Sequence, residues 1–182
     1  MVLVKNRTVV DDPWVRVADD EPLPESRPAV VSLERWKRDR QALIERNAPV
    51  GVRLKSDQPP SLIGDDLCRL GMVALEFPKF TDGRAYSYVR LLRERLGFQG
   101  EVRAVGNVLR DQLAFMERGG FDAFELPDKA DVAAWLTALD EISVSYQPGG
   151  RLRTSAVELR SAPVILSPST ERESLAVGMW AY

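Results

Sequence analysis

Three junctions along this chain have the same order, in which a helix ends, a glycine follows and a strand begins. They read "RLGMVALEF", "RLGFQGEVRAV" and "RGGFDAFEL". Their spacing of roughly 22 to 27 residues suits one strand and one helix, because parallel strands need a crossover between them. The repeat therefore predicts a mixed α/β fold with a parallel sheet.

Short apolar stretches mark the expected strands: "VGVRLKS", "MVALEFPK", "EVRAVGN", "DAFELPD" and "ISVSYQP". Between them apolar residues return at helical spacing, as they do at Val132, Trp135, Leu136 and Leu139. About five βα units are too few for a complete eight-stranded barrel. We expect a part-barrel, similar to a fragment of a TIM barrel, or an open sheet with its strands in sequential order.

The two ends of the chain differ from this middle part. Residues 1–31 are expected to form an irregular, acidic and proline-rich arm with a short strand at Trp14–Val17, and residues 149–182 a tail. The core domain, 32–148, opens with a helix over "SLERWKRDRQALIERN" that is capped by Ser32. We expect the arm and the tail to cover sheet surface that a part-barrel leaves bare, or to reach a second subunit in a homodimer.

Several residue types are scarce, and this excludes whole classes of chemistry. The chain has no histidine and a single cysteine, Cys68, which excludes Ser–His triads and histidine- or cysteine-ligated metal sites within it. It has neither a G-x-G-x-x-G nor a G-x-x-x-x-G-K-[ST] motif, so no cofactor is evident. A net charge of -2 argues against binding to nucleic acid or to an anionic membrane. No spanning segment or signal peptide is recognisable, so a cytoplasmic location is expected.

The loop "PKFTDGRAYS" joins a predicted strand to a predicted helix, and it is dense in charge. In parallel α/β proteins ligands bind outside the carboxyl ends of the strands, where this loop begins. Turn and capping chemistry accounts for Asp82 as the helix cap and Gly83 as the turn residue. It does not account as well for Lys79 and Arg84. These two are predicted to bind an anion, although Arg84 could instead pair with Asp111 or Glu76 and only fix the loop.

Four predicted strands each contain a single charged residue within an apolar run, and the sign alternates along the chain. The four are Arg53, Glu76, Arg103 and Glu125. If these strands are neighbours, the charges can pair laterally as a polar layer, because an unpaired buried charge is costly. The alternative is that they meet a ligand, and Arg103 is then the best candidate for an oxyanion, which a guanidinium can bind through two nitrogens.

The candidate site follows from these features. Its anion-binding residues are predicted to be Lys79, Arg84, Arg103 and Asn107, the last as the N-cap of the next helix. Glu76 or Asp82 is the candidate for proton transfer. Lys79 also stands at a strand end, where Schiff-base lysines occur.

The stretch from Glu76 to Leu126 resembles a bacterial family, domain of unknown function nine-three-four. The shared pieces are "FPKFTDGR", "YS", "LRER", "GEVRAVG", "VLRDQ" and "GFDAF". The likeness extends more loosely from Trp14 to about Gln147. The chain departs from the family pattern at Asn107 and Gly119, where relatives often have aspartate and cysteine.

The resemblance implies an association with assimilatory sulfite reduction, in which family members are described as oxidoreductases. Because the chain has no evident redox group, we expect an accessory protein or partner of sulfite reductase that binds a small sulfur oxyanion. The alternative is a small part-barrel enzyme, a lyase or isomerase, acting on a phosphorylated or carboxylated metabolite. A closed pocket of roughly a few hundred Å³ favours the enzyme, whereas a flat, arginine-rimmed apolar patch favours docking.

Overall fold

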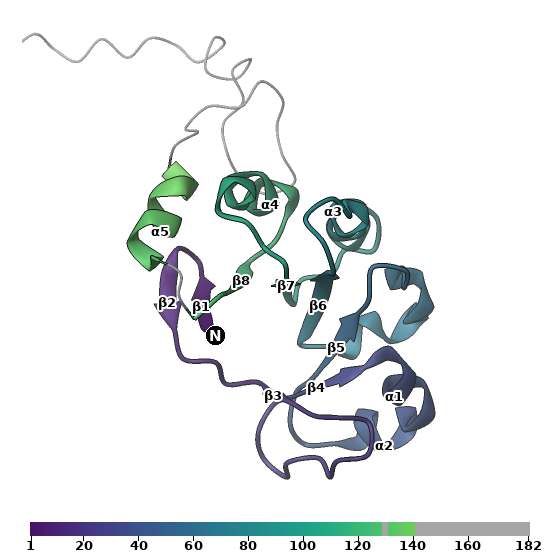
Figure 1. The fold of residues 1–182 in the computed structure, drawn as a ribbon. Coiled ribbons are helices and arrows are strands. Elements are labelled where there is room, and N and C mark those ends of the chain that lie inside the picture. The colour runs from purple at the N-terminus through teal and green to yellow at the C-terminus, as the bar shows by residue number, and fades with distance from the viewer. Residues whose placement is uncertain (129–130, 141–182) are drawn as a thin grey trace, which may run out of the picture.

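The computed structural model describes residues 1–128 and 131–140. Eight strands form one sheet in the order β2-β1-β8-β7-β6-β5-β4-β3 (Figure 1). Their bounds are β1 Val2–Lys5, β2 Thr8–Val10, β3 Val15–Arg16, β4 Ala29–Ser32, β5 Val50–Leu54, β6 Met72–Phe77, β7 Glu101–Gly106 and β8 Ala123–Leu126. Strands β3 to β8 are parallel to one another, and β1 is antiparallel to both β8 and β2.

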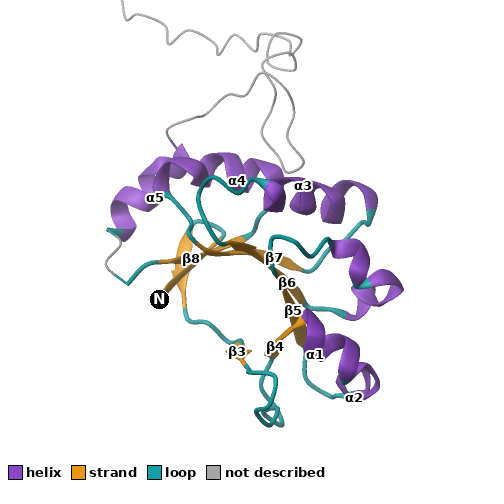
Figure 2. Ribbon diagram, turned by 45° about the vertical axis from the view of Figure 1, so that its right-hand side comes forward, coloured by secondary structure: helices purple, strands orange, loops and turns teal. Residues whose placement is uncertain are grey.

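Short helices connect the parallel strands and lie on the outer, convex face of the sheet (Figure 2). The α-helices are α1 Leu33–Arg38, α2 Arg40–Glu45, α3 Arg84–Arg90, α4 Leu113–Gly119 and α5 Val132–Asp140. Tighter 3-10 turns occupy Pro60–Leu62, Gly64–Arg69 and Arg110–Gln112, and a π-helical turn, Leu91–Arg95, continues α3. Within the described ranges, none of the helices has the length and apolar character that a bilayer crossing requires.

The sheet curls into a half-barrel, and the chain connection proves how far it curls. Strands β2 and β3 are the two edges of the sheet, yet they are separated by only the four residues 11–14. The step from Val10 to Val15 can span at most roughly 18 Å. The two edges of an eight-stranded sheet are therefore less than about four strand spacings apart. The prediction of an α/β part-barrel with sequential parallel strands is confirmed.

Strand pleating divides the side chains between two environments. In β6, Val73, Leu75 and Phe77 are buried in the apolar layer beneath the helices. The alternate positions, Ala74 and Glu76, point to the concave face, because successive side chains lie on opposite sides of a sheet. The side chains of β4, β5, β7 and β8 alternate in the same way. Most of the charged side chains of these strands therefore lie on the concave face.

The N-terminal arm is more regular than the sequence analysis expected. It contributes β1, β2 and β3 to the sheet, and the predicted boundary between 31 and 32 falls inside β4. The β1–β2 hairpin turns at Asn6 and Arg7, whose φ angles are 49° and 65°. A two-residue loop with both φ angles positive matches the twist of antiparallel strands, and asparagine favours it. Arg7 is unusual there, and its bonds to Glu117, at 2.9 and 2.7 Å, fix it in place.

Some helix predictions also need correction. Ser32 does cap α1, since its hydroxyl accepts a hydrogen bond from the backbone N–H of Arg35 at 3.0 Å. The single helix expected over 32–47 is instead two short ones, which meet at Asp39. The strand expected at "ISVSYQP" and the tail 149–182 lie outside the described residues.

Two predicted helix caps are wrong. Asn107 directly follows β7, and its backbone N–H donates to Phe77 at 2.7 Å, whereas the next helical turn is capped at Leu109. Helix α3 is capped at Gly83, whereas Asp82 accepts from the backbone N–H of Arg84 at 3.2 Å without capping the helix. In both cases the turn after the strand is longer than the sequence pattern suggested.

Candidate functional site

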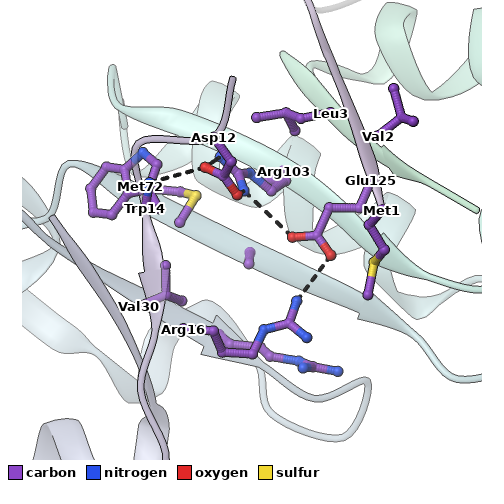
Figure 3. Close-up of a pocket in the computed structure, with 12 residues that line it drawn as sticks. Met1, Val2, Leu3, Asp12, Trp14, Arg16, Val30, Met72, Arg103 and Glu125 are labelled. Atoms are coloured by element: carbon purple, nitrogen blue, oxygen red, sulfur yellow. Dashed lines mark hydrogen bonds and ion pairs between the residues drawn. The ribbon is translucent and has the colours of Figure 1, made fainter. Parts of the chain in front are cut away.

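Two adjoining cavities open on the concave face of the half-barrel. The first, here called the inner cavity, has a volume of about 210 Å³ and lies between the sheet and the segment that crosses from β2 to β3 (Figure 3). The second, the rim cavity, has a volume of about 760 Å³. It is lined by Ser32, Lys55 and Glu76 at the carboxyl ends of β4, β5 and β6, and by the arm after β3. Arg16, Val30 and Arg53 line both.

A network of charged side chains lies at the inner cavity. It consists of Lys5, Asp12, Arg16, Glu101, Arg103 and Glu125, and all but Lys5 and Glu101 line the cavity. Lys5 pairs with Glu101 at 2.7 Å, and Glu101 accepts from Arg103 at 2.8 Å. Glu125 joins Arg103, at 3.4 Å, to Arg16, at 2.9 Å. With three cations and three carboxylates the network is neutral.

Arg103 is the centre of this network. Its side chain is 2% exposed, and Asp12 accepts from two of its nitrogens, at 2.6 and 3.0 Å (Figure 3). Burial alone would lower the pKa of Arg103, but the hydrogen bond to Asp12 and the charge of Glu101 outweigh it and raise the pKa above the ordinary value. Three carboxylates of the chain therefore occupy the place that an external anion would take.

The other charged pair of the predicted layer has a more open environment. Arg53 and Glu76 lie on the neighbouring strands β5 and β6, and their nearest charged atoms are 3.0 Å apart. Their side chains are 29% and 25% exposed, and both line the rim cavity. Within the described residues, the guanidinium of Arg53 makes this one ion pair and no hydrogen bond, and its Nε is buried without a partner. All four residues of the predicted layer thus share the concave face, in two neighbouring-strand pairs.

The charged loop before α3 forms a compact cluster of its own. Arg84 pairs with Asp82 at 2.7 Å and donates to the hydroxyl of Ser56 at 2.9 Å. Tyr88 donates to the backbone carbonyl of Ser56 at 3.1 Å, which ties α3 to the end of β5. The hydrogen bond from Arg84 holds the pKa of Asp82 well below its usual range. Asp82 is therefore poorly suited to proton transfer near neutral pH.

The structure does not gather the four predicted anion-binding residues in one cavity. Arg103 lines the inner cavity, whereas Lys79, Arg84 and Asn107 line neither the inner nor the rim cavity. Lys79 is exposed, and within the described residues its ammonium group makes no ion pair or hydrogen bond. The roles given to these residues stay predictions.

Four residues of the charge network were missed in the sequence analysis. Glu101 could have been found, because it precedes Arg103 by two residues and period-two alternation places it on the same face. No local sequence pattern predicts the positions of Lys5, Asp12 and Arg16, because they depend on how the arm joins the edges of the sheet. In the part of the chain that the structure describes, no group of cysteine and carboxylate side chains could hold a metal ion.

The fold and the concave face define the class of this protein, an α/β half-barrel with a polar interior and a ligand-sized cavity at the carboxyl ends of its strands. The sequence matches the model of a bacterial family of proteins of unknown function, DUF934, over residues 51–157, more than half of the chain. The chain therefore belongs to this family. The comparison with curated proteins found no match.

Proposed function

We propose that this protein is an accessory protein of assimilatory sulfite reduction that binds a small oxyanion-bearing ligand in the rim cavity. The family resemblance supports the association with sulfite reductase, and the expected cytoplasmic location belongs to the same proposal. The binding site is supported by the number of ion pairs that Arg53 makes. The guanidinium of Arg53 lines the rim cavity and makes one ion pair within the described residues, whereas the guanidinium of Arg103 pairs with three carboxylates.

The position and size of the rim cavity support a small ligand. Ligand sites in parallel α/β proteins lie outside the carboxyl ends of the strands, where Lys55 and Glu76 line this cavity. Its volume of about 760 Å³ is within the range of small-molecule sites. The terminal nitrogens of Arg53 make one ion pair, with Glu76. A ligand oxyanion would add charge-assisted hydrogen bonds at these terminal nitrogens.

Titration calorimetry with sulfite, and separately with phosphate, tests this site. The unsubstituted chain should bind one of these anions, and Arg53→Ala should lower the affinity at least tenfold, because a charge-assisted hydrogen bond is lost. Arg90→Ala is the matched control, since Arg90 is exposed on α3 and pairs with Glu94 outside both cavities. Equal binding by Arg53→Ala and Arg90→Ala would refute the assignment of the site.

The proposed partnership is tested separately. Purified sulfite reductase and this protein should co-elute in gel filtration, and sedimentation of the protein alone shows whether it forms the expected homodimer. Separate elution across the micromolar range would remove the reductase from the proposal and leave the ligand site to be judged by calorimetry.

A second candidate function, a small lyase or isomerase, is favoured by the contact between Glu76 and Arg53. A carboxylate beside a cation that holds an oxyanion is placed to move a proton on the bound molecule. In a strain that lacks its own copy and is given sulfite as the sulfur source, Glu76→Gln should then fail to restore growth although the protein still binds the anion. Restored growth would instead favour a binding role without catalysis.

A further inference from the structure

The rim cavity carries charges of both signs, and this restricts the ligand beyond an oxyanion. Its cations are Arg16, Arg53 and Lys55, and its carboxylates are Asp19, Glu21, Glu34 and Glu76. The lining therefore has one negative charge in excess. A simple anion would meet attraction at Arg53 but net repulsion from the lining as a whole.

The unpaired carboxylates are on one wall of the cavity. On the sheet side, Glu34 pairs with Lys55 at 3.4 Å, and Glu76 pairs with Arg53 at 3.0 Å. The arm side carries Asp19 and Glu21, and neither has an ion pair within the described residues.

Both arm carboxylates accept hydrogen bonds from neutral groups. Asp19 accepts from the hydroxyl of Ser32 at 2.6 Å, and Glu21 accepts from the backbone N–H of Ala18 at 3.1 Å. The nearby cation Arg38 does not neutralise Asp19 directly, since it donates to the backbone carbonyl of Asp19 and pairs its charge with Asp39. Each carboxylate keeps oxygen lone pairs that a cationic donor can use.

The rim cavity also has apolar lining residues. They are Val17 from the arm and Val30 and Val31 from β4. The lining thus offers a cation on the sheet, carboxylates on the arm and an apolar surface for the body of a ligand.

We infer that the ligand is a small zwitterion, a molecule with an oxyanion at one end and a protonated amine at the other. Its oxyanion contacts Arg53, and its ammonium group contacts Asp19 and Glu21. This inference rests on the proposed function, because it assigns the class of ligand for the same cavity. The ammonium group neutralises the excess negative charge that a bare oxyanion leaves in place.

Three probes with the same two-carbon body separate the contributions of the two ends. They are 2-aminoethanesulfonate, ethanesulfonate and ethylamine, each titrated into the full chain and followed by the backbone amide signals of Val17 and Ala18. The zwitterion should bind about tenfold or more tightly than either of the other two, because it alone makes charge-assisted hydrogen bonds at both ends.

Substitutions assign the ammonium end. The double variant Asp19→Asn, Glu21→Gln should bind 2-aminoethanesulfonate about tenfold more weakly while its affinity for ethanesulfonate does not fall. Asp20→Asn is the matched control, because Asp20 is an exposed neighbour that does not line the cavity. It should bind all three probes as the unsubstituted chain does.

The outcomes separate this inference from the proposed function. Equal affinities for the two sulfonates, with both lost in Arg53→Ala, would overturn the zwitterion and keep the oxyanion site. An unchanged affinity of the double variant for 2-aminoethanesulfonate would also overturn it. If neither sulfonate nor sulfite binds, both proposals fall.

Discussion

Arg103 shows how a single buried residue can organise a polar interior. A guanidinium has five N–H donors in one rigid plane, so it can bind several carboxylates through separate nitrogens, whereas the ammonium of a lysine is a point charge with three donors. Here it meets Asp12 from the crossing segment, Glu101 from its own strand and Glu125 from β8. The arginine thereby links three parts of the chain that are far apart in sequence.

Truncation of this residue should be costly. Arg103→Ala removes the buried cation that three carboxylates share and leaves Asp12 without its ion pair, whereas Glu101 and Glu125 keep Lys5 and Arg16. We expect a loss of about 3–5 kcal/mol in the free energy of unfolding. Urea unfolding followed by circular dichroism measures it. Arg90→Ala is the control, since an exposed ion pair between residues four apart on a helix contributes only about 0.3–0.5 kcal/mol. If Arg103→Ala does not fold, Arg103→Lys should fold with an intermediate loss. A loss below about 1 kcal/mol for Arg103→Ala would contradict the central role of this arginine.

Among the structural elements, the end of β7 depends on one glycine. Gly106 has a φ of 93°, and a Cβ added there would lie 2.6 Å from the backbone oxygen of Phe77. The close approach allows Asn107 to keep its backbone hydrogen bond to Phe77 at 2.7 Å. A side chain at this position meets both an unfavourable φ and a backbone atom that cannot move aside.

Gly106→Ala should therefore lower the free energy of unfolding by about 1–3 kcal/mol or more. Gly83→Ala provides the comparison, because Gly83 has a φ of -87° and an added Cβ would be 3.8 Å from its nearest neighbour. That variant should lose less stability than Gly106→Ala, since its only expected cost is that alanine is a poorer N-cap than glycine. Thermal unfolding of both proteins checks the pair, and similar melting temperatures for the two variants would refute the explanation.

The crossing segment is held to the sheet by a carboxylate, which makes its attachment dependent on pH. Burial would raise the pKa of Asp12, but hydrogen bonds from Arg103 and from the backbone of Trp14 outweigh it and leave the pKa below its ordinary value of 3.8. A carboxylate whose pKa is lower in the folded state than in the unfolded state stabilises the folded state at pH values above the unfolded-state pKa. This contribution is lost as the pH falls through the folded-state pKa. The segment should stay attached down to about pH 4 and loosen below it.

Hydrogen exchange of the backbone amides of Val15 and Val17 measures this attachment, since these amides bond to Pro28 and Val30 at 2.9 and 3.0 Å. In Asp12→Asn the two amides should exchange faster above pH 4, and the acid-dependent step should shrink. Asp11→Asn, at the exposed neighbouring position, serves as the control. Identical exchange profiles for Asp12→Asn and the unsubstituted chain would show that Asp12 does not hold the segment.

At the scale of the whole molecule, the N-terminal hairpin protects an edge of the half-barrel. Strand β1 pairs with β8 over four residues and buries Leu3 and Val4. Without it, β8 would be a free edge with unpaired backbone groups, which favours association with other chains. The arm is therefore an integral part of this sheet.

Deletion of residues 2–10 should make the protein associate in a concentration-dependent way and melt at a lower temperature. Sedimentation velocity over a range of concentrations measures the association. Val9→Lys is the control, because Val9 is 54% exposed on the outer edge strand β2 and its replacement leaves β1 in place. A truncated chain with unchanged mass and stability would contradict the protective role of the hairpin.

The sequence by itself determined the middle of this fold. Strands β5 to β8 follow from short apolar runs and glycine-marked junctions, which are local signals, and the sequential parallel order follows from the length of the crossovers. The alternating charges at Arg53, Glu76, Arg103 and Glu125 could be found for the same reason, since each is a single charge in an apolar strand. The sequence also predicted the charged loop between β6 and α3, but it did not predict that Arg84 contacts Asp82 and Ser56 within this cluster.

Only the tertiary structure decided how the arm is used and where the cavities lie. The contacts of Asp12 with Arg103 and of Arg16 with Glu125 join residues about 90 to 110 positions apart. Such contacts depend on the curl of the sheet, which brings β2 and β3 within reach of a four-residue segment. No local pattern encodes the distance between these two edges, because it depends on the twist that accumulates over all eight strands. The rim cavity exists for the same reason: strand ends and arm meet there only after the sheet has curled.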